Sequence, residues 1–191
     1  MFPVDAFRAT ISRFADILSQ HGIRFHLTGG VTSAIWGEPR MTQDIDIVVD
    51  NEALATQLDP FLNMLSKSVF MFDEESIRSA VRRRKLFQLL DTQASLKLDV
   101  YPRELIPGEL NRSELTEIFE GLSLPIASRS DAAASKLVWI SKGSHKSRRD
   151  LRRIYSSAGE TDRQRIGQLA AELHLSNLLT EVLTEPDEII D

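Results

Sequence analysis

The chain has 191 residues, of which 42% are hydrophobic and 27% are charged, so it can bury a core of ordinary size. It has no cysteine, which excludes disulfide bonds and thiolate chemistry. The net charge is −5, no apolar run is long enough to span a bilayer, and the N-terminus lacks a secretory signal, so we expect a cytoplasmic protein with no membrane partner.

Hydrophobic spacing predicts alternating helices and strands over the first hundred residues. One predicted helix contains Pro60, which should kink or split it. In chain order we expect helices over 7–18, 31–36, 51–65 and 74–84, and strands over 23–27, 44–49, 85–90 and 95–101.

Beyond about residue 102 the strand signals fade, except over 122–127, and helical patterns dominate. We therefore expect an α/β or α+β core with a small mixed sheet over residues 1–104, with helices packed on it. A mostly helical C-terminal region over 105–191 should complete the functional site. Its predicted helices cover 131–141, 147–156, 162–173 and 176–183.

A glycine pair, Gly29-Gly30, ends the first predicted strand. Glycines can bring backbone N–H groups close to a phosphate, because no Cβ blocks the approach. A plain strand-to-helix turn would explain the glycines equally well. It would not explain the acids that follow on the next strand.

Three acids lie on predicted strands, each on the face opposite the aliphatic residues: Asp44, Asp46 and Asp99. If these strands are neighbours, the carboxylates converge, and two unit charges ~5 Å apart repel by about 3 kcal/mol at an effective dielectric near 20. A divalent cation would offset this repulsion, and two cations would also hold a nucleoside triphosphate. The alternative is solvated strand ends. It is weaker for Asp44 and Asp46, because acids are depleted in strands.

The order of these motifs resembles the DNA polymerase β-like nucleotidyltransferase superfamily. Gly29-Gly30 is followed by thirteen residues, then by Asp44-Ile45-Asp46, then by Asp99 on a later strand. In the second half, Asp131–Lys136 followed by Arg148-Arg149-Asp150-Leu151 resembles the nucleotidyltransferase toxins of type IV toxin–antitoxin systems. The resemblance implies transfer from a nucleoside triphosphate with Mg²⁺, with two ions expected, and a cognate antitoxin protein.

Carried over residue by residue, the resemblance implies roles for the first half of the chain. Gly29 and Gly30 would approach the triphosphate. Asp44 and Asp46 would hold metal and serve catalysis. Asp99 would complete the metal site or act as the base.

In the second half the resemblance implies that Lys136 contacts phosphate in a catalytic role and that Asp150 orients Lys136 or the substrate. The alternatives are an ordinary helix lysine and a surface ion pair between Asp150 and Arg149. Arg40 could contact phosphate or be a loop arginine, and Ser33 could reach a phosphate or face solvent.

The acceptor is left open by these motifs. Some members of the toxin family add nucleotides to the acceptor end of tRNA, and the basic stretch Lys142–Arg153 would be a natural contact for an RNA backbone. Solvated helix faces are the alternative reading of this stretch. Two other functions remain: nucleotidyl transfer to a small molecule of the antibiotic type, and a nucleotide-binding module without transfer.

Overall fold

The computed structural model describes residues 4–38 and 44–185, and it confirms a mixed-sheet core followed by a mostly helical part. The strands are β1 (Phe25–Leu27), β2 (Asp44–Val49), β3 (Phe70–Met71), β4 (Phe87–Asp91), β5 (Leu96–Tyr101), β6 (Glu114–Phe119) and β7 (Leu122–Ile126). The helices are α1 (Val4–Gln20), α2 (Gly29–Trp36), α3 (Asn51–Thr56), α4 (Leu58–Ser66), α5 (Glu74–Arg83), α6 (Arg129–Ser141), α7 (Lys146–Ser156), α8 (Glu160–Glu172) and α9 (Ser176–Thr184), with a 3-10 turn η1 (Glu109–Arg112).

The described residues form two compact units: 4–31 with 44–127, and 32–38 with 128–185. The first unit continues past residue 104, the end of the core expected from sequence, because β6 and β7 extend the sheet to Ile126. The N-terminal residues of α2 belong to the first unit and its later residues to the second.

The first unit is built on a seven-stranded sheet with the order β3-β4-β5-β2-β1-β7-β6. β2 runs parallel to β5 and antiparallel to β1, and β1 runs parallel to β7. The edge strand β6 was not predicted. Leu115 on it is 75% exposed, so the strand lacks the buried alternation by which strands are recognised.

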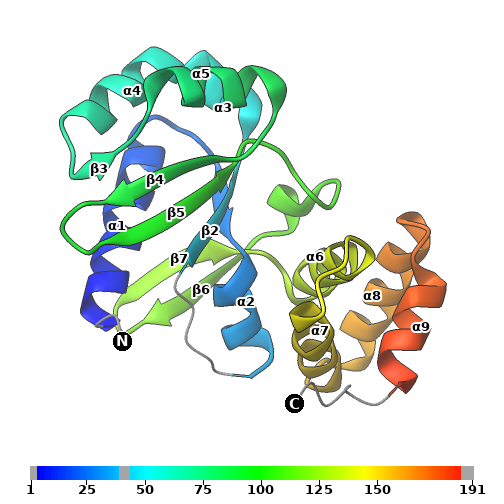
Figure 1. Cartoon of the computed structure of the whole chain (residues 1–191). Coiled ribbons are helices and arrows are strands. Elements are labelled where there is room, and N and C mark those ends of the chain that lie inside the picture. Colours follow the sequence, from blue (N-terminus) through cyan, green and yellow to red (C-terminus); the bar gives the residue numbers. More distant parts are fainter. Residues whose placement is uncertain (1–3, 39–43, 186–191) are drawn as a thin grey trace. The chain divides into compact units, whose positions relative to one another are not determined.

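Helix α1 packs on the sheet through an apolar stripe that includes Ile11, Phe14 and Leu18. The ring of Phe14 meets those of Phe61 on α4 and Phe70 on β3, with centroids 6.3 and 5.6 Å apart. Figure 1 shows α3, α4 and α5 grouped together along one side of this unit. These contacts join α1, α4 and β3 in the core of the first unit.

The predicted helix over 51–65 is split, as Pro60 suggested. The break falls at Gln57, which separates α3 from α4. Pro60 therefore lies in the first turn of α4, where its missing N–H costs no intrahelical hydrogen bond.

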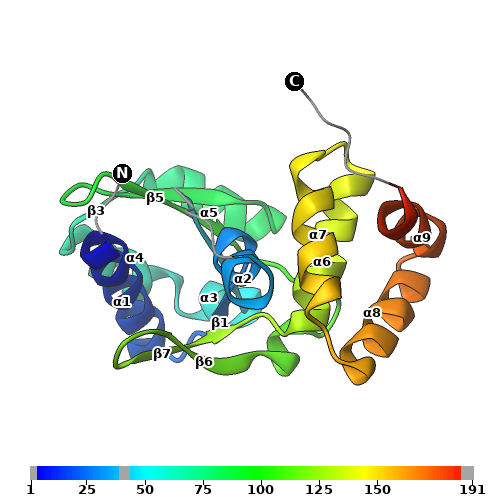
Figure 2. The same cartoon turned by 90° about the horizontal axis from the view of Figure 1, so that it is seen from below.

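The second unit is a helical bundle of α6 to α9, which lie side by side in Figure 2. Its core includes Ala132 and Leu137 on α6 and Leu151 and Ile154 on α7, and Trp36 packs against it. The alanines of α6 let neighbouring helices approach closely. No helix in the described part of the chain has both the length and the apolar character needed to cross a bilayer.

Candidate active site

Strand β2 presents its acids on the face opposite its buried aliphatic residues. Ile45 and Ile47 are at most 1% exposed, whereas Asp44 is exposed and Asp46 half-buried. In the parallel register with β5, Asp46 lies beside Asp99, and Asp44 beside Lys97. The expectation that these strands are neighbours is confirmed. Paired residues of adjacent strands share a face, so Asp46 and Asp99 point the same way.

Each of these acids is held by a side chain that the sequence analysis did not single out. Lys97 Nζ lies 3.3 Å from both Asp44 Oδ1 and Asp99 Oδ2. Gln88 on β4 donates from Nε2 to Asp99 Oδ1 at 2.9 Å, and the Tyr101 hydroxyl donates to Asp46 Oδ1 at 3.3 Å. The period-two alternation of β5, which puts residues 97, 99 and 101 on one face, was the signal that could have identified two of them.

The electrostatics of this face are visible in two pKa shifts. Partial burial acts to lower the pKa of Lys97, but the hydrogen bond and charge of Asp99, followed by those of Asp44, raise the pKa above its ordinary value. Burial and the negative charges of Asp46 and Asp99 raise the pKa of the Tyr101 hydroxyl well above its usual range. Tyr101 therefore remains a protonated hydrogen-bond donor to Asp46.

Gly29 is in direct contact with Asp46. Its φ is +61°, a left-handed conformation that favours glycine, and a Cβ at this position would lie 2.0 Å from Asp46 Oδ2. Gly30 follows as a buried residue in the first turn of α2. The glycine turn thus brings the backbone at the start of α2 against the carboxylate of β2.

The acids do not form a ready-made metal cluster. Over residues 4–38 and 44–185, no three His, Cys, Asp or Glu side chains are arranged to hold a metal ion. The ammonium group of Lys97 lies between Asp44 and Asp99. The donor chemistry nevertheless suits Mg²⁺, because the set offers only carboxylate oxygens.

In the second unit, Lys136 on α6 and Asp150 on α7 form a buried ion pair. Their residues are 7% and 9% exposed, and Lys136 Nζ lies 2.9 Å from Asp150 Oδ2. Asp150 is therefore not part of a surface pair with Arg149, and Lys136 is not an ordinary exposed lysine. The fold thus brings Lys136 and Asp150 together, and the roles that the resemblance implies for them stay predictions.

Ser33 is 2% exposed, so the alternative that it faces solvent is wrong. Its hydroxyl donates to Asp150 Oδ2 at 3.0 Å, which adds a third member to the buried pair. Its suggested contact with a phosphate stays a prediction. Arg40 lies outside the described residues.

The arginines of the stretch Lys142–Arg153 have partners inside the second unit. Arg149 Nη2 lies 2.8 Å from Glu38 Oε2, and Arg153 also pairs with Glu38. Arg148 pairs with Glu181. Acids therefore lie next to three arginines of this stretch, and Arg149 and Arg153 share a single carboxylate.

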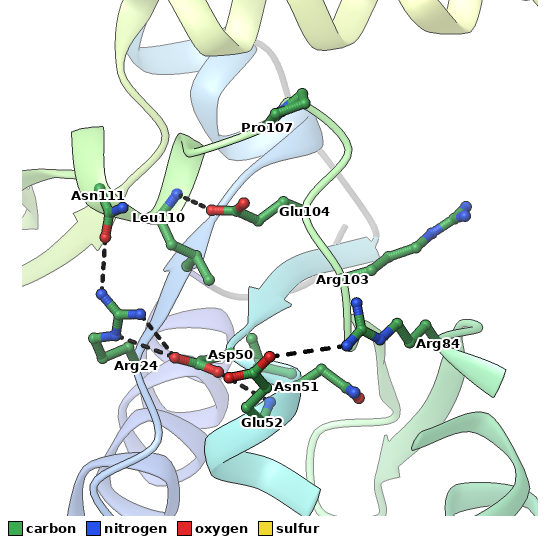
Figure 3. Close-up of a pocket in the computed structure, with 11 residues that line it drawn as sticks. Arg24, Asp50, Asn51, Glu52, Arg84, Arg103, Glu104, Pro107, Leu110 and Asn111 are labelled. Atoms are coloured by element: carbon green, nitrogen blue, oxygen red, sulfur yellow. Dashed lines mark hydrogen bonds and ion pairs between the residues drawn. The ribbon is translucent and has the colours of Figure 1, made fainter. Parts of the chain in front are cut away.

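A cavity of about 390 Å³ lies at the other end of β2, beyond Val49 (Figure 3). Its charges are compensated internally, since Arg24 pairs with Asp50 at 2.8 Å and Arg84 with Glu52 at 4.0 Å. Partial burial raises the pKa of Asp50, but hydrogen bonds from Arg24 and two backbone N–H groups bring it below the ordinary value. None of the predicted site residues lines this cavity.

Comparison with known proteins decides the family. Residues 14–174 match the family described as nucleotidyl transferase AbiEii toxin of type IV TA systems. The chain belongs to this AbiEii family. It is accordingly a nucleotidyltransferase of the toxin–antitoxin class, as the resemblance of its motifs implied. A comparison with curated protein sequences found no match.

Solved structures support the fold of this AbiEii family member. The antibiotic-resistance factor ANT(2'')-Ia shares 13% identity over 95% of this chain and 97% of its own, with a TM-score of 0.60. An antigenic nucleotidyltransferase-like protein from Paracoccidioides brasiliensis shares 16% identity over 95% and 94%, with a TM-score of 0.51. At these identities the likeness concerns the fold alone.

Proposed function

We propose that this chain transfers a nucleotide from a nucleoside triphosphate to an acceptor, using the acids of β2 and β5 and Mg²⁺. The observation that carries the proposal is the pairing of Asp46 with Asp99 on neighbouring parallel strands, with Gly29 against Asp46. Acids that lie beside each other on adjacent strands repel, and a bound cation would offset this repulsion.

Mg²⁺ would be held by Asp44, Asp46 and Asp99. The backbone cradle that a Cβ at Gly29 would fill, together with the all-oxygen donor set, fits such an ion. When bound, Mg²⁺ neutralises the triphosphate and polarises the reacting phosphorus centre. Two ions are expected from the superfamily pattern.

The chain's own groups bind, orient and move protons. The N-terminus of α2 at Gly29 and Gly30 presents backbone N–H groups and a favourable dipole to phosphate. Tyr101 and Gln88 fix the orientation of Asp46 and Asp99 through their hydrogen bonds. Asp99 is also the candidate base for the acceptor hydroxyl.

The contributions of the second unit follow from the family resemblance. Lys136 would contact phosphate, and Asp150 would hold its ammonium in place with the help of Ser33. The buried pair supports this proposal, because the contact with Asp150 holds the Lys136 ammonium group in one position.

The acceptor we favour is tRNA or another RNA, since the chain belongs to a toxin family. The family also implies a cognate antitoxin as partner, and we propose that both act in the cytoplasm. A small-molecule acceptor of the antibiotic type is the second candidate, favoured by the fold shared with the antibiotic-resistance factor. A nucleotide-binding module without transfer is the third.

The test is incubation with each radiolabelled nucleoside triphosphate, Mg²⁺ and total cellular RNA, read on a denaturing gel. The wild-type chain should label RNA, and Asp46→Asn should abolish labelling with an unchanged circular dichroism spectrum. Asp59→Asn, which alters a 79% exposed acid, is the matched control and should keep wild-type labelling. Nucleotide binding by calorimetry without product on RNA or antibiotics would favour the binding module.

A further inference from the structure

Lys97 occupies a position that the proposed function gives to a metal ion. Its ammonium nitrogen is equidistant from Asp44 Oδ1 and Asp99 Oδ2, at 3.3 Å. It lies two residues before Asp99 on the same face of β5, so its side chain runs along the acid-bearing surface. A single positive charge therefore already bridges two of the three proposed metal ligands.

This contact differs from an ordinary surface ion pair, in which both partners face water and gain little. The Asp99 side chain is only 12% exposed, and both of its oxygens are engaged, Oδ1 by Gln88 and Oδ2 by Lys97. A cation that approaches Asp99 Oδ2 has to replace the ammonium group. The Lys97 side chain is 40% exposed, so it has room to withdraw into solvent.

We infer that Lys97 is a built-in counter-cation that competes with Mg²⁺ for Asp44 and Asp99. In the metal-free protein it offsets the repulsion between the acids. When a metal ion binds, the ammonium leaves both carboxylates, and the oxygens it covered become metal ligands. The inference rests on the proposed function for the identity of the metal ligands. It adds that metal affinity is set by a residue that is not itself a ligand.

Two consequences follow from charge alone. Without Lys97 the acids repel one another more strongly, so the metal-free protein should be less stable. Replacing Lys97 also removes a cation that competes with Mg²⁺ for the carboxylates and repels it, so Mg²⁺ should bind more tightly. Replacing a surface lysine that does not contact the acids would change neither the stability of the metal-free protein nor its affinity for Mg²⁺.

The first experiment compares Lys97→Met with Lys67→Met, a control at an exposed lysine of the same unit. Thermal unfolding is followed in EDTA and in rising Mg²⁺, and Mg²⁺ affinity is measured by calorimetry without nucleotide. Lys97→Met should melt at a lower temperature than wild type in EDTA, gain more from Mg²⁺, and bind Mg²⁺ about tenfold more tightly. Lys67→Met should match the wild type. Equal or weaker Mg²⁺ binding by Lys97→Met, or no binding by either protein, overturns the inference.

A second measurement uses the wild-type chain and so does not depend on a variant that folds. An amine-acetylating reagent is applied with and without Mg²⁺, and modification at each lysine is quantified by mass spectrometry. Acetylation of Lys97 should rise several-fold on addition of Mg²⁺, while that of Lys67 stays constant. An unchanged rate at Lys97 under saturating Mg²⁺ contradicts displacement.

The failure of this inference can be told apart from the failure of the proposed function. If Asp46→Asn abolishes transfer while Lys97→Met leaves Mg²⁺ affinity unchanged, the enzyme assignment stands and the role of Lys97 falls. If Asp46→Asn leaves transfer intact, the assignment of the acids themselves is wrong.

Discussion

Substituting alanine at Gly29 tests whether the glycine turn and Asp46 form one unit. The new residue would have to hold a φ of +61°, which costs a non-glycine residue about 1–2 kcal/mol. Its Cβ would also lie 2.0 Å from Asp46 Oδ2 and 2.5 Å from Asp46 Cγ, so the carboxylate has to move. The side-chain and backbone shifts that remove such an overlap lower the unfolding free energy by about 1–3 kcal/mol. The total loss of unfolding free energy should be about 2–5 kcal/mol.

Gly22→Ala is the matched control. Gly22 has a φ of +63°, but a Cβ there would meet no atom within 4 Å. It should lose only the backbone contribution of about 1–2 kcal/mol and keep full transfer activity. Urea unfolding gives both free energies, and the labelling assay gives both rates. Displacement of Asp46 by about 1 Å should lower the rate of Gly29→Ala by about 100-fold. Equal stability and equal rates for the two variants would refute the reasoning.

Three further predictions concern single contacts. Tyr101→Phe removes the hydroxyl that donates to Asp46. The unfolding free energy measured in urea should fall by about 1 kcal/mol, and the labelling rate should fall as well. An unchanged rate would show that Asp46 does not need this hydrogen bond. Lys136→Met leaves Asp150 as a buried charge with no lysine partner. The unfolding free energy should therefore fall by about 3–5 kcal/mol. A loss below about 1 kcal/mol would mean that the pair is exposed to water in solution. Burial acts to raise the pKa of Asp91, but hydrogen bonds from a threonine hydroxyl, an arginine and two backbone N–H groups bring the pKa below its ordinary value. The ionised Asp91 side chain therefore stabilises the fold fully above about pH 4, and this stabilisation is lost as the pH falls through the lowered pKa. The difference in unfolding free energy between wild type and Asp91→Asn should narrow below about pH 4. A constant difference down to about pH 2 would contradict a lowered pKa for Asp91.

The part of the site on β2 and β5 could be predicted from sequence because it depends on alternation alone. Because side chains alternate along a strand, Asp46 lies on the face opposite Ile45 and Ile47. The same alternation on β5 places Asp99 on the face opposite the aliphatic residues of that strand. The neighbouring position of the two strands is a property of the sheet order. It could only be supposed from the sequence, because local spacing does not determine which strands pair.

Other features depend on contacts between residues far apart in the chain. Ser33 meets Asp150 across 117 residues, and Arg149 meets Glu38 across 111. Nothing in the local pattern around either residue indicates its partner. The positive stretch of α7 therefore suggested an RNA surface, whereas the fold brings acids to several of its arginines.

The boundary of the sheet was also hidden from sequence reasoning. β6 exposes Leu115 and was not predicted, whereas β7 lies within the strand signal over 122–127 although it contains Pro125. β6 is the edge strand and needs no hydrogen-bond partner on its outer side, and β7 meets β1 at Ile126, one residue beyond Pro125.

The most direct test of the central claim is the initial rate of nucleotide transfer by Asp46→Asn, measured with the labelled triphosphate that the wild type uses best. The variant keeps the size of the side chain and removes its charge. If Asp46 and Asp99 form the catalytic centre, the rate should fall at least about 100-fold while urea unfolding shows a native fold. A folded Asp46→Asn protein that transfers at the wild-type rate would contradict the account.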